Sequence, residues 1–176
     1  MKHLLKKEKN YSYIEVGEGK PIIVLHGLMG GLSNFDAVTT FFSQKGYKVI
    51  VPVLPIYSMS LLRTNVKAFS KYVFEFIKFK QLENVIVLGN SLGGHIGLYL
   101  TKQHPEIVKA LVITGSSGLY ESAMGGGYTK RGDYEVIKKK AQDVFYDPAV
   151  ATKEIVDEVY ETVNDRNKLI KTLAIA

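Results

Sequence analysis

The chain has 176 residues, 46% of them hydrophobic, which suits one globular domain with a buried core and is too short to predict two. It has no cysteine, which excludes disulfides and thiolate metal sites, and no apolar run of membrane-spanning length, so we expect a cytoplasmic protein without membrane span, metal or cofactor. The net charge of +6 is uneven, with +7 on residues 1–116 and −1 on residues 117–176. The lysines of the first part are not interleaved with aromatic residues, which favours an ordinary solvated surface over nucleic-acid binding.

Short apolar segments predict the strands of a sheet. They lie at Tyr11–Val16, Ile22–Leu25, Tyr47–Val51, Val85–Leu88 and Val108–Ile113. The last four are rich in valine and isoleucine, and at least three of them are apolar at nearly every position. Such continuous runs are typical of parallel strands that are buried on both faces.

Helical patterns separate these strands. They occupy residues 33–46, 65–77 and 91–104. Ser33 and Asn65 are the expected N-caps of the first two helices, and Gly46 is placed to end the first. The third helix should stop at His104, because the residue before Pro105 avoids helical dihedral angles. Strands alternating with helices imply right-handed crossovers and a parallel α/β sheet, the predicted fold class of residues 1–116.

The pattern changes after residue 116. Amphipathic stripes follow without a strand between them, at 134–144, 155–163 and 169–173. We expect the middle helix to begin at Asp147-Pro148, with proline at the first helical position. A run of helices after a parallel sheet predicts a helical lid at 117–176 over a core at 1–116.

The pentapeptide Gly89-Asn90-Ser91-Leu92-Gly93 fits the pattern G-x-S-x-G and lies directly between a predicted strand and a predicted helix. A serine at such a turn is pushed out above the carboxyl edge of the sheet, and Gly89 and Gly93 leave room for the tight packing. Ser91 is therefore the expected nucleophile, with backbone dihedrals unusual for a residue other than glycine. The alternative is a loop serine in a nucleotide-binding α/β fold, but no G-x-G-x-x-G or Walker pattern supports it.

A second motif, His26-Gly27-Leu28, follows the strand at 22–25, and together the two motifs resemble the α/β-hydrolase superfamily over the whole chain. The resemblance implies an oxyanion hole built from two backbone N–H groups, those of Leu28 and of Leu92, the residue after the nucleophile. A plain glycine-rich turn at 26–31 is the alternative interpretation.

Within the superfamily, Gly-Asn-Ser-Leu-Gly-Gly at 89–94 is similar to the elbow of carbon–carbon bond hydrolases that cleave ring-fission products, and Asn34-Phe35 resembles another of their active-site elements. Their glycine- and proline-rich oxyanion loop is absent, so their substrate is not carried over. Serine at position 91, where haloalkane dehalogenases and epoxide hydrolases carry aspartate, argues against both of those activities.

The base and the acid that would complete a triad with Ser91 are not evident. Superfamily members place them after the serine, acid first and histidine second. Only His95 and His104 follow Ser91, and both are better explained as packing or surface residues; the segment 114–120 holds no carboxylate. We expect the acid and the histidine to lie beyond Ala176.

The sequence thus predicts a serine hydrolase, carboxylesterase- or lipase-like, acting on a small-molecule ester with an apolar acyl or alcohol group. Two alternatives stay open, namely a non-catalytic α/β-hydrolase fragment and a cofactor-free C–C bond hydrolase. If no further strand follows, Val108–Ile113 is an open sheet edge, at which we expect self-association or pairing with a second chain.

Overall fold

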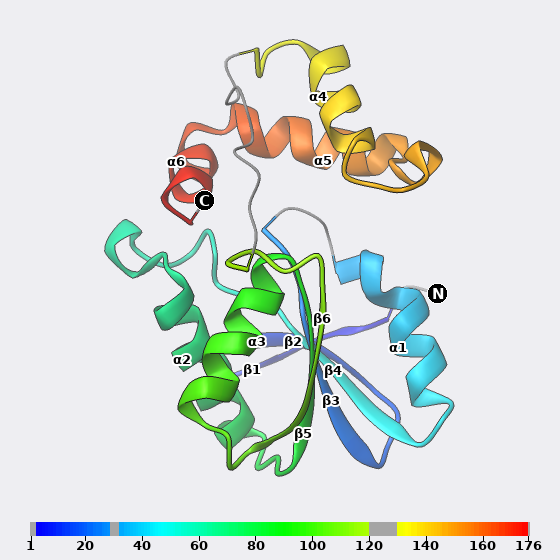
Figure 1. The fold of residues 1–176 in the computed structure, drawn as a ribbon, viewed down its shortest axis with the longest axis vertical. Coiled ribbons are helices and arrows are strands. Elements are labelled where there is room, and N and C mark those ends of the chain that lie inside the picture. The colour runs from blue at the N-terminus through cyan, green and yellow to red at the C-terminus, as the bar shows by residue number, and fades with distance from the viewer. Residues whose placement is uncertain (1–2, 29–31, 120–129, 176) are drawn as a thin grey trace.

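Figure 1 shows the computed structural model of the chain, which describes residues 3–28, 32–119 and 130–175. A six-stranded sheet has α2 and α3 on one face and α1 on the other. The strands are β1 (Leu5–Glu8), β2 (Tyr11–Val16), β3 (Lys20–Leu25), β4 (Tyr47–Pro52), β5 (Val85–Asn90) and β6 (Val108–Thr114). The α-helices are α1 (Asp36–Ser43), α2 (Val66–Phe79), α3 (Leu92–Gln103), α4 (Tyr134–Gln142), α5 (Lys153–Asn164) and α6 (Arg166–Ile175). Short 3-10 turns are η1 (Leu32–Phe35), η2 (Leu61–Arg63) and η3 (Pro148–Val150).

The strand order is β1-β2-β4-β3-β5-β6, and β4, β3, β5 and β6 are parallel to one another. The predicted parallel core sheet is therefore confirmed, with β6 at its edge among the described strands. At the other edge, β2 runs antiparallel to β4 and to β1. The sequence did not predict β1, because Leu5–Glu8 is charged and mostly exposed. It forms through pairing with β2, where Leu5 lies opposite Ile14.

The central strands are buried on both faces, as their continuous apolar runs predict. In β3, Ile23 and Leu25 belong to the cluster that contains buried residues of α2 and α3. Ile22 and Val24 point the other way, into a cluster covered by η1 and α1. Each face of the sheet is thus packed by its own cluster of apolar side chains.

Two of the expected helix boundaries differ from the structure. Asn65 caps α2 as predicted, its side-chain oxygen accepting the Ala68 N–H at 2.9 Å. Ser33 is not an N-cap, because it lies inside the turn η1, and α1 begins only at Asp36 without a side-chain cap. The middle helix of the C-terminal segment also begins later than the sequence predicts.

That middle helix, α5, begins at Lys153 rather than at Asp147-Pro148. The Asp147 carboxylate does accept a capping bond from the Ala149 N–H at 2.9 Å, but the turn that it starts, η3, ends at Val150. Thr152 is extended and separates η3 from α5. An aspartate–proline pair favours any helical turn, short or long, so the pattern could not distinguish the two.

Helices α4, α5 and α6 lie above the carboxyl ends of the parallel strands (Figure 1). The described part of residues 117–175 holds no strand, and its own buried apolar residues are few: Ile137, Ala141, Val156, Val163 and Leu169. One of its contacts with the core is made by α6, where Ile175 packs against the larger core cluster. In the described parts of the chain, every helix is too short or too polar to cross a membrane.

Candidate active site

Ser91 occupies the turn between β5 and α3, with φ 52° and ψ −119°. Positive φ is rare and strained for a residue that carries a Cβ atom, and it concentrates at functional turns. The turn is held by backbone bonds: the Ser91 N–H donates to the Thr114 carbonyl at 3.0 Å, and the Ser91 carbonyl accepts from Gly94 and His95. The strand-to-helix turn that the motif predicts is therefore present, with the unusual dihedrals expected of it.

The two glycines of the motif are required by the closeness of the backbone around this turn. A Cβ atom on Gly93 would overlap the Leu25 carbonyl at the end of β3. A Cβ atom on Gly89 would overlap the Gly93 carbonyl one turn along the chain. Helix α3 thus presses its first turn against two strand ends, which explains why only glycine fits at either position.

The loop after β3 runs beside the serine. A Cβ atom on Gly27 would lie 3.3 Å from the Ser91 Cβ, so the His26-Gly27-Leu28 backbone borders the serine directly. Leu92 is the first residue of α3, and its N–H is one that the hydrogen bonds of the helix leave unpaired. The structure thus brings together the two segments that carry the expected oxyanion donors, Leu28 and Leu92.

His26 braces this loop. It is 8% exposed, and the Leu54 N–H donates to its Nε2 at 2.9 Å. Since Nε2 accepts, the ring proton is on Nδ1, which donates to the Gly27 carbonyl at 2.8 Å. Burial lowers the pKa of the imidazole, only partly opposed by the Gly27 carbonyl, and keeps it neutral.

The His26 bond also orients the expected oxyanion donor. The Gly27 carbonyl and the Leu28 N–H belong to one planar peptide, and in a trans peptide they point in opposite directions. The structure has no cis peptide bond in its described residues. Holding the Gly27 carbonyl therefore fixes the direction in which the Leu28 N–H points.

Sequence reasoning missed the segment that supports this loop from behind, residues 53–57 after β4. Besides the Leu54 bond to His26, the Tyr57 hydroxyl donates to the Leu28 carbonyl at 3.1 Å. These partners are 28 and 29 positions apart in the chain. No local pattern signals such a contact, because it depends on β3 and β4 being neighbours in the sheet.

The asparagine before the serine is part of the framework around the turn. The Asn90 amide donates to the Thr114 carbonyl and to the Thr114 hydroxyl, both at 3.1 Å, and so ties the carboxyl ends of β5 and β6 together. Its Oδ1 lies near Gly27, 3.5 Å from where a Cβ would be. Asn34, the other residue similar to C–C bond hydrolases, is exposed in η1.

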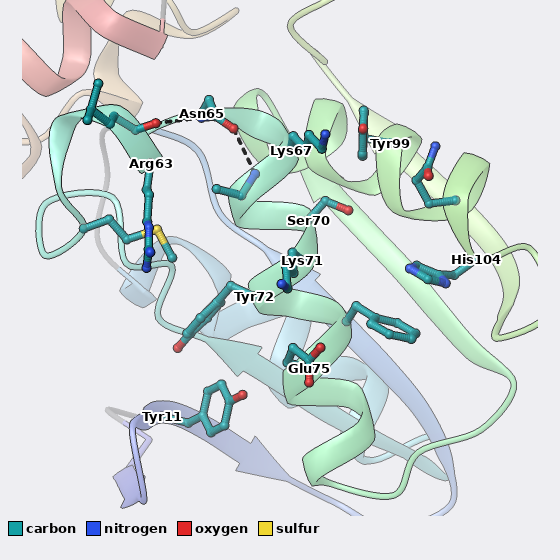
Figure 2. Close-up of a pocket in the computed structure, with 15 residues that line it drawn as sticks. Tyr11, Arg63, Asn65, Lys67, Ser70, Lys71, Tyr72, Glu75, Tyr99 and His104 are labelled. Carbon is teal, nitrogen blue, oxygen red and sulfur yellow. Dashed lines mark hydrogen bonds between the residues drawn. The ribbon is translucent and has the colours of Figure 1, made fainter.

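The described histidines other than His26 are engaged elsewhere. His104 stacks on Phe74 with ring centroids 3.6 Å apart and lines a cavity of about 790 Å³ on the outer side of α2 (Figure 2). His3 lies beside Thr40 and Asp36. The ring of His95 lies against Gly118. Among residues 3–28, 32–119 and 130–175, no cluster of three potential metal ligands occurs.

A parallel sheet with a strained serine turn at the end of β5 is the arrangement of an α/β hydrolase. The family model for the α/β-hydrolase fold matches residues 20–141, so the chain belongs to this family.

Proteins to which the chain is similar include an α/β-hydrolase enzyme of known structure, a dienoic acid hydrolase and a lipase. The crystal structure of MGS-MChE2, an α/β-hydrolase enzyme from the metagenome of lagoon sediments of Mar Chica, Morocco, is 56% identical, with TM-score 0.75 over 98% of this chain and 64% of that one. The 2-hydroxy-6-oxo-6-(2'-aminophenyl)hexa-2,4-dienoic acid hydrolase of Metapseudomonas resinovorans is 26% identical over 76% of this chain and 50% of its own length. Lipase 1 of Psychrobacter immobilis is 29% identical over 64% of this chain and 37% of its own. The chain thus spans at most about half the length of these two curated relatives.

Proposed function

We propose that the chain carries the nucleophile and the oxyanion hole of a serine hydrolase that cleaves esters with an apolar acyl or alcohol group. The observation that supports this most strongly is Ser91 itself, held at φ 52° between β5 and α3 with the His26-Gly27-Leu28 loop against it. Strain of this kind is retained where the surrounding structure enforces it, and here glycines at 89 and 93 do so.

In the proposed reaction the Ser91 hydroxyl attacks the ester carbonyl carbon, and a base takes the hydroxyl proton. The carbonyl oxygen becomes an oxyanion, which accepts hydrogen bonds from the Leu28 and Leu92 N–H groups. The tetrahedral species then collapses, and the protonated base gives its proton to the leaving alkoxide, which departs as the alcohol. The same base next takes a proton from water, which attacks the acyl carbon and releases the acid, and the serine recovers its proton from the base. His26 supplies no base in this scheme, because both of its ring nitrogens are already hydrogen-bonded.

Helices α4–α6 are proposed to form the lid of this site, since they stand above the strand ends where Ser91 lies (Figure 1). An apolar substrate fits this placement, because exposed apolar side chains such as Leu173 (57% exposed) occur on the same helices.

The test follows from the proposal that none of the described histidines acts as the base for Ser91. We expect the 176-residue chain to react with a fluorophosphonate only at a trace rate, since a serine hydroxyl without a base is a weak nucleophile. Added imidazole should supply the base and raise the rate of adduct formation at Ser91 at least tenfold, measured by intact mass and peptide mapping. The matched controls are S91A and S117A, which remove a serine of the site and a serine of a neighbouring loop.

The proposal fails if S91A is labelled as fast as the parent protein in imidazole. It also fails if Ser91 stays unlabelled in imidazole although the protein is folded; that outcome supports a non-catalytic fragment instead. Rapid Ser91 labelling without imidazole would keep Ser91 as nucleophile but assign the base to a histidine of the chain, with H95Q as the deciding variant.

A second candidate is hydrolysis of a carbon–carbon bond without a cofactor. It is favoured by the Metapseudomonas relative and by Asn90, whose amide is fixed beside Ser91. Comparing a 2-hydroxy-6-oxo-dienoate with a short-chain aryl ester under the same conditions distinguishes the two, because only a C–C hydrolase consumes the dienoate chromophore.

A further inference from the structure

Residues 53–57 lie between the expected oxyanion loop and the helical segment above the core. On the loop side, the Leu54 N–H is bonded to His26 and the Tyr57 hydroxyl to the Leu28 carbonyl at 3.1 Å. Leu54 and Ile56 are 4% and 2% exposed and belong to the larger core cluster. The segment is therefore anchored in the core and positions the loop from a fixed place.

The same segment is held from the other side by α6. The Lys171 ammonium donates to the Tyr57 carbonyl at 2.6 Å, and the Lys168 ammonium lies 5.8 Å from the centre of the Tyr57 ring. The Thr172 hydroxyl, in a residue 2% exposed, is close enough to lower the pKa of the Tyr57 phenol slightly, but it makes no hydrogen bond within the described part of the chain. Three residues of one helix thus surround a single tyrosine, at its backbone, its ring and its hydroxyl.

The Tyr57 phenol is suited to act as a fixed donor. Burial raises its pKa above the usual value, with a smaller opposing effect from Thr172, so it keeps its proton at neutral pH. Its acceptor, the Leu28 carbonyl, belongs to the peptide that follows the one carrying the Leu28 N–H. Together with the His26 bond to the Gly27 carbonyl, the Tyr57 bond fixes the backbone on both sides of the Leu28 Cα.

We propose that Tyr57 is a positioning residue that couples the docking of α6 to the orientation of Leu28, so that the oxyanion donor is fully ordered only while α6 is seated on residue 57. The proposal rests on the proposed function for its catalytic consequence. Its structural part, that α6 orders residues 26–28 through Tyr57, holds or fails independently of any activity of Ser91.

The structural part is tested by hydrogen exchange of the peptide amides at 26–28 in three variants of the 176-residue chain. Y57F removes the phenol hydroxyl, and K171M removes the hydrogen bond from the α6 side. Y72F is the matched control, because the Tyr72 hydroxyl also donates to a carbonyl of this segment, Val53 at 3.2 Å, but not to the loop. We expect faster exchange at 26–28 in Y57F and K171M, by about tenfold, and no change in Y72F.

If the coupling passes through Tyr57, the effects of two substitutions along it on the exchange rate should not add. In a Y57F background, K171M should add little to the exchange rate at 26–28, since the connection is already lost. Additive effects of Y57F and K171M, or unchanged exchange in Y57F alone, would overturn the proposal. Equal acceleration in Y57F and Y72F would also overturn it, because the effect would then be a general loosening of the segment.

The catalytic part is tested with imidazole and an aryl ester. Complete loss of one oxyanion donor typically costs ~10²–10³ in turnover, so a donor that is loosened rather than removed should cost about tenfold. We expect Y57F to lower kcat about tenfold with KM within twofold, and Y72F to leave both within twofold. An effect of Y57F on KM alone contradicts a role in positioning the donor. If no variant, nor the parent, reacts at Ser91, the proposed function fails, while the exchange experiment still decides the coupling.

Discussion

The core of residues 3–116 and the helical segment of residues 130–175 are built by different means. The core is fixed by apolar residues on both faces of its sheet and by backbone approaches so close that glycine is obligatory at 89 and 93. The helical segment buries fewer apolar residues, and exposed polar contacts also join its parts, such as Tyr134 Oη to Asp157 at 2.6 Å and Asn164 to the Arg131 carbonyl at 2.8 Å.

The difference shows which region tolerates change. A close-packed core fixes backbone positions to fractions of an ångström and penalises any added atom. Exposed hydrogen bonds and ion pairs contribute little each and can be rearranged. The expected nucleophile, Ser91, belongs to the close-packed core, whereas the helices above it belong to the second region. Substitutions in those helices are therefore expected to be tolerated better than substitutions around Ser91.

The largest expected effect is on the free energy of unfolding, when a glycine of the core is replaced and a glycine of the helical segment serves as the comparison. G93A puts a Cβ into the Leu25 carbonyl and should lower the free energy of unfolding by about 3–5 kcal/mol, as other severe core substitutions do. G132A, where nothing lies within 4 Å, should change it by less than about 0.5 kcal/mol. Urea unfolding monitored by circular dichroism measures both, and equal effects would contradict the comparison.

The next largest effect is the pH dependence that His26 gives the core. Its folded-state pKa lies below the ordinary value near 6.5, so between these two values the unfolded chain binds a proton that the native chain does not. Stability should therefore fall as pH drops below about 6.5, by at most about 1.4 kcal/mol per pH unit. In H26Q this part of the slope should be missing when urea unfolding is compared between pH 7.5 and 5. An unchanged slope would mean that His26 titrates alike in both states.

A smaller effect concerns the edge of the sheet. We propose that β6 is a site of self-association, because it lies at the edge of the described sheet and Val112 is 47% exposed there. V112K should weaken association on the order of tenfold, about 1.4 kcal/mol, in sedimentation velocity. V144K adds the same charge to an exposed site of the helical segment and should leave association unchanged. A parent chain that is monomeric at all concentrations would remove the basis for this proposal.

The smallest effect is expected from the polar cluster of the helical segment. Asp157 pairs with Lys153 and with Tyr134, and the bonds from these two groups lower its pKa. Because the cluster is exposed, Y134F should shift Tm by no more than about 2 °C. A drop comparable to that of G93A would show that the helical segment is as tightly specified as the core.

The sequence predicts the parts of the fold whose signals are local. Continuous valine and isoleucine runs mark β3 to β6, and the G-x-S-x-G pattern between strand and helix places the Ser91 turn. It does not predict β1, because that charged strand exists only by pairing with β2. It also misplaces the start of α5, since an Asp–Pro pair caps a short turn and a long helix alike.

The residues of the candidate site also fall into two groups, those that local motifs predict and those that depend on contacts distant in the sequence. Gly27, Leu28, Ser91 and Leu92 can be found by their motifs, because each lies within a few residues of a strand end. The motif places His26 in the loop, but its bond to the Leu54 N–H depends on a contact 28 positions away. Tyr57 could not be found, since its bond to Leu28 spans 29 positions and depends on how β3 and β4 lie in the sheet. Long-range polar partners of a motif are thus the information that a single sequence lacks.

The position of β5 between β3 and β6 has a consequence for how the protein is made. Every strand that touches the strand of Ser91 is encoded before residue 115, and the segment that supports the loop behind it, residues 53–57, is encoded earlier still. During synthesis from the N-terminus, the complete support of the serine turn therefore emerges from the ribosome before any residue of α4, α5 or α6. The strands and the loop that support the serine turn are therefore available for folding before the helices above it have emerged.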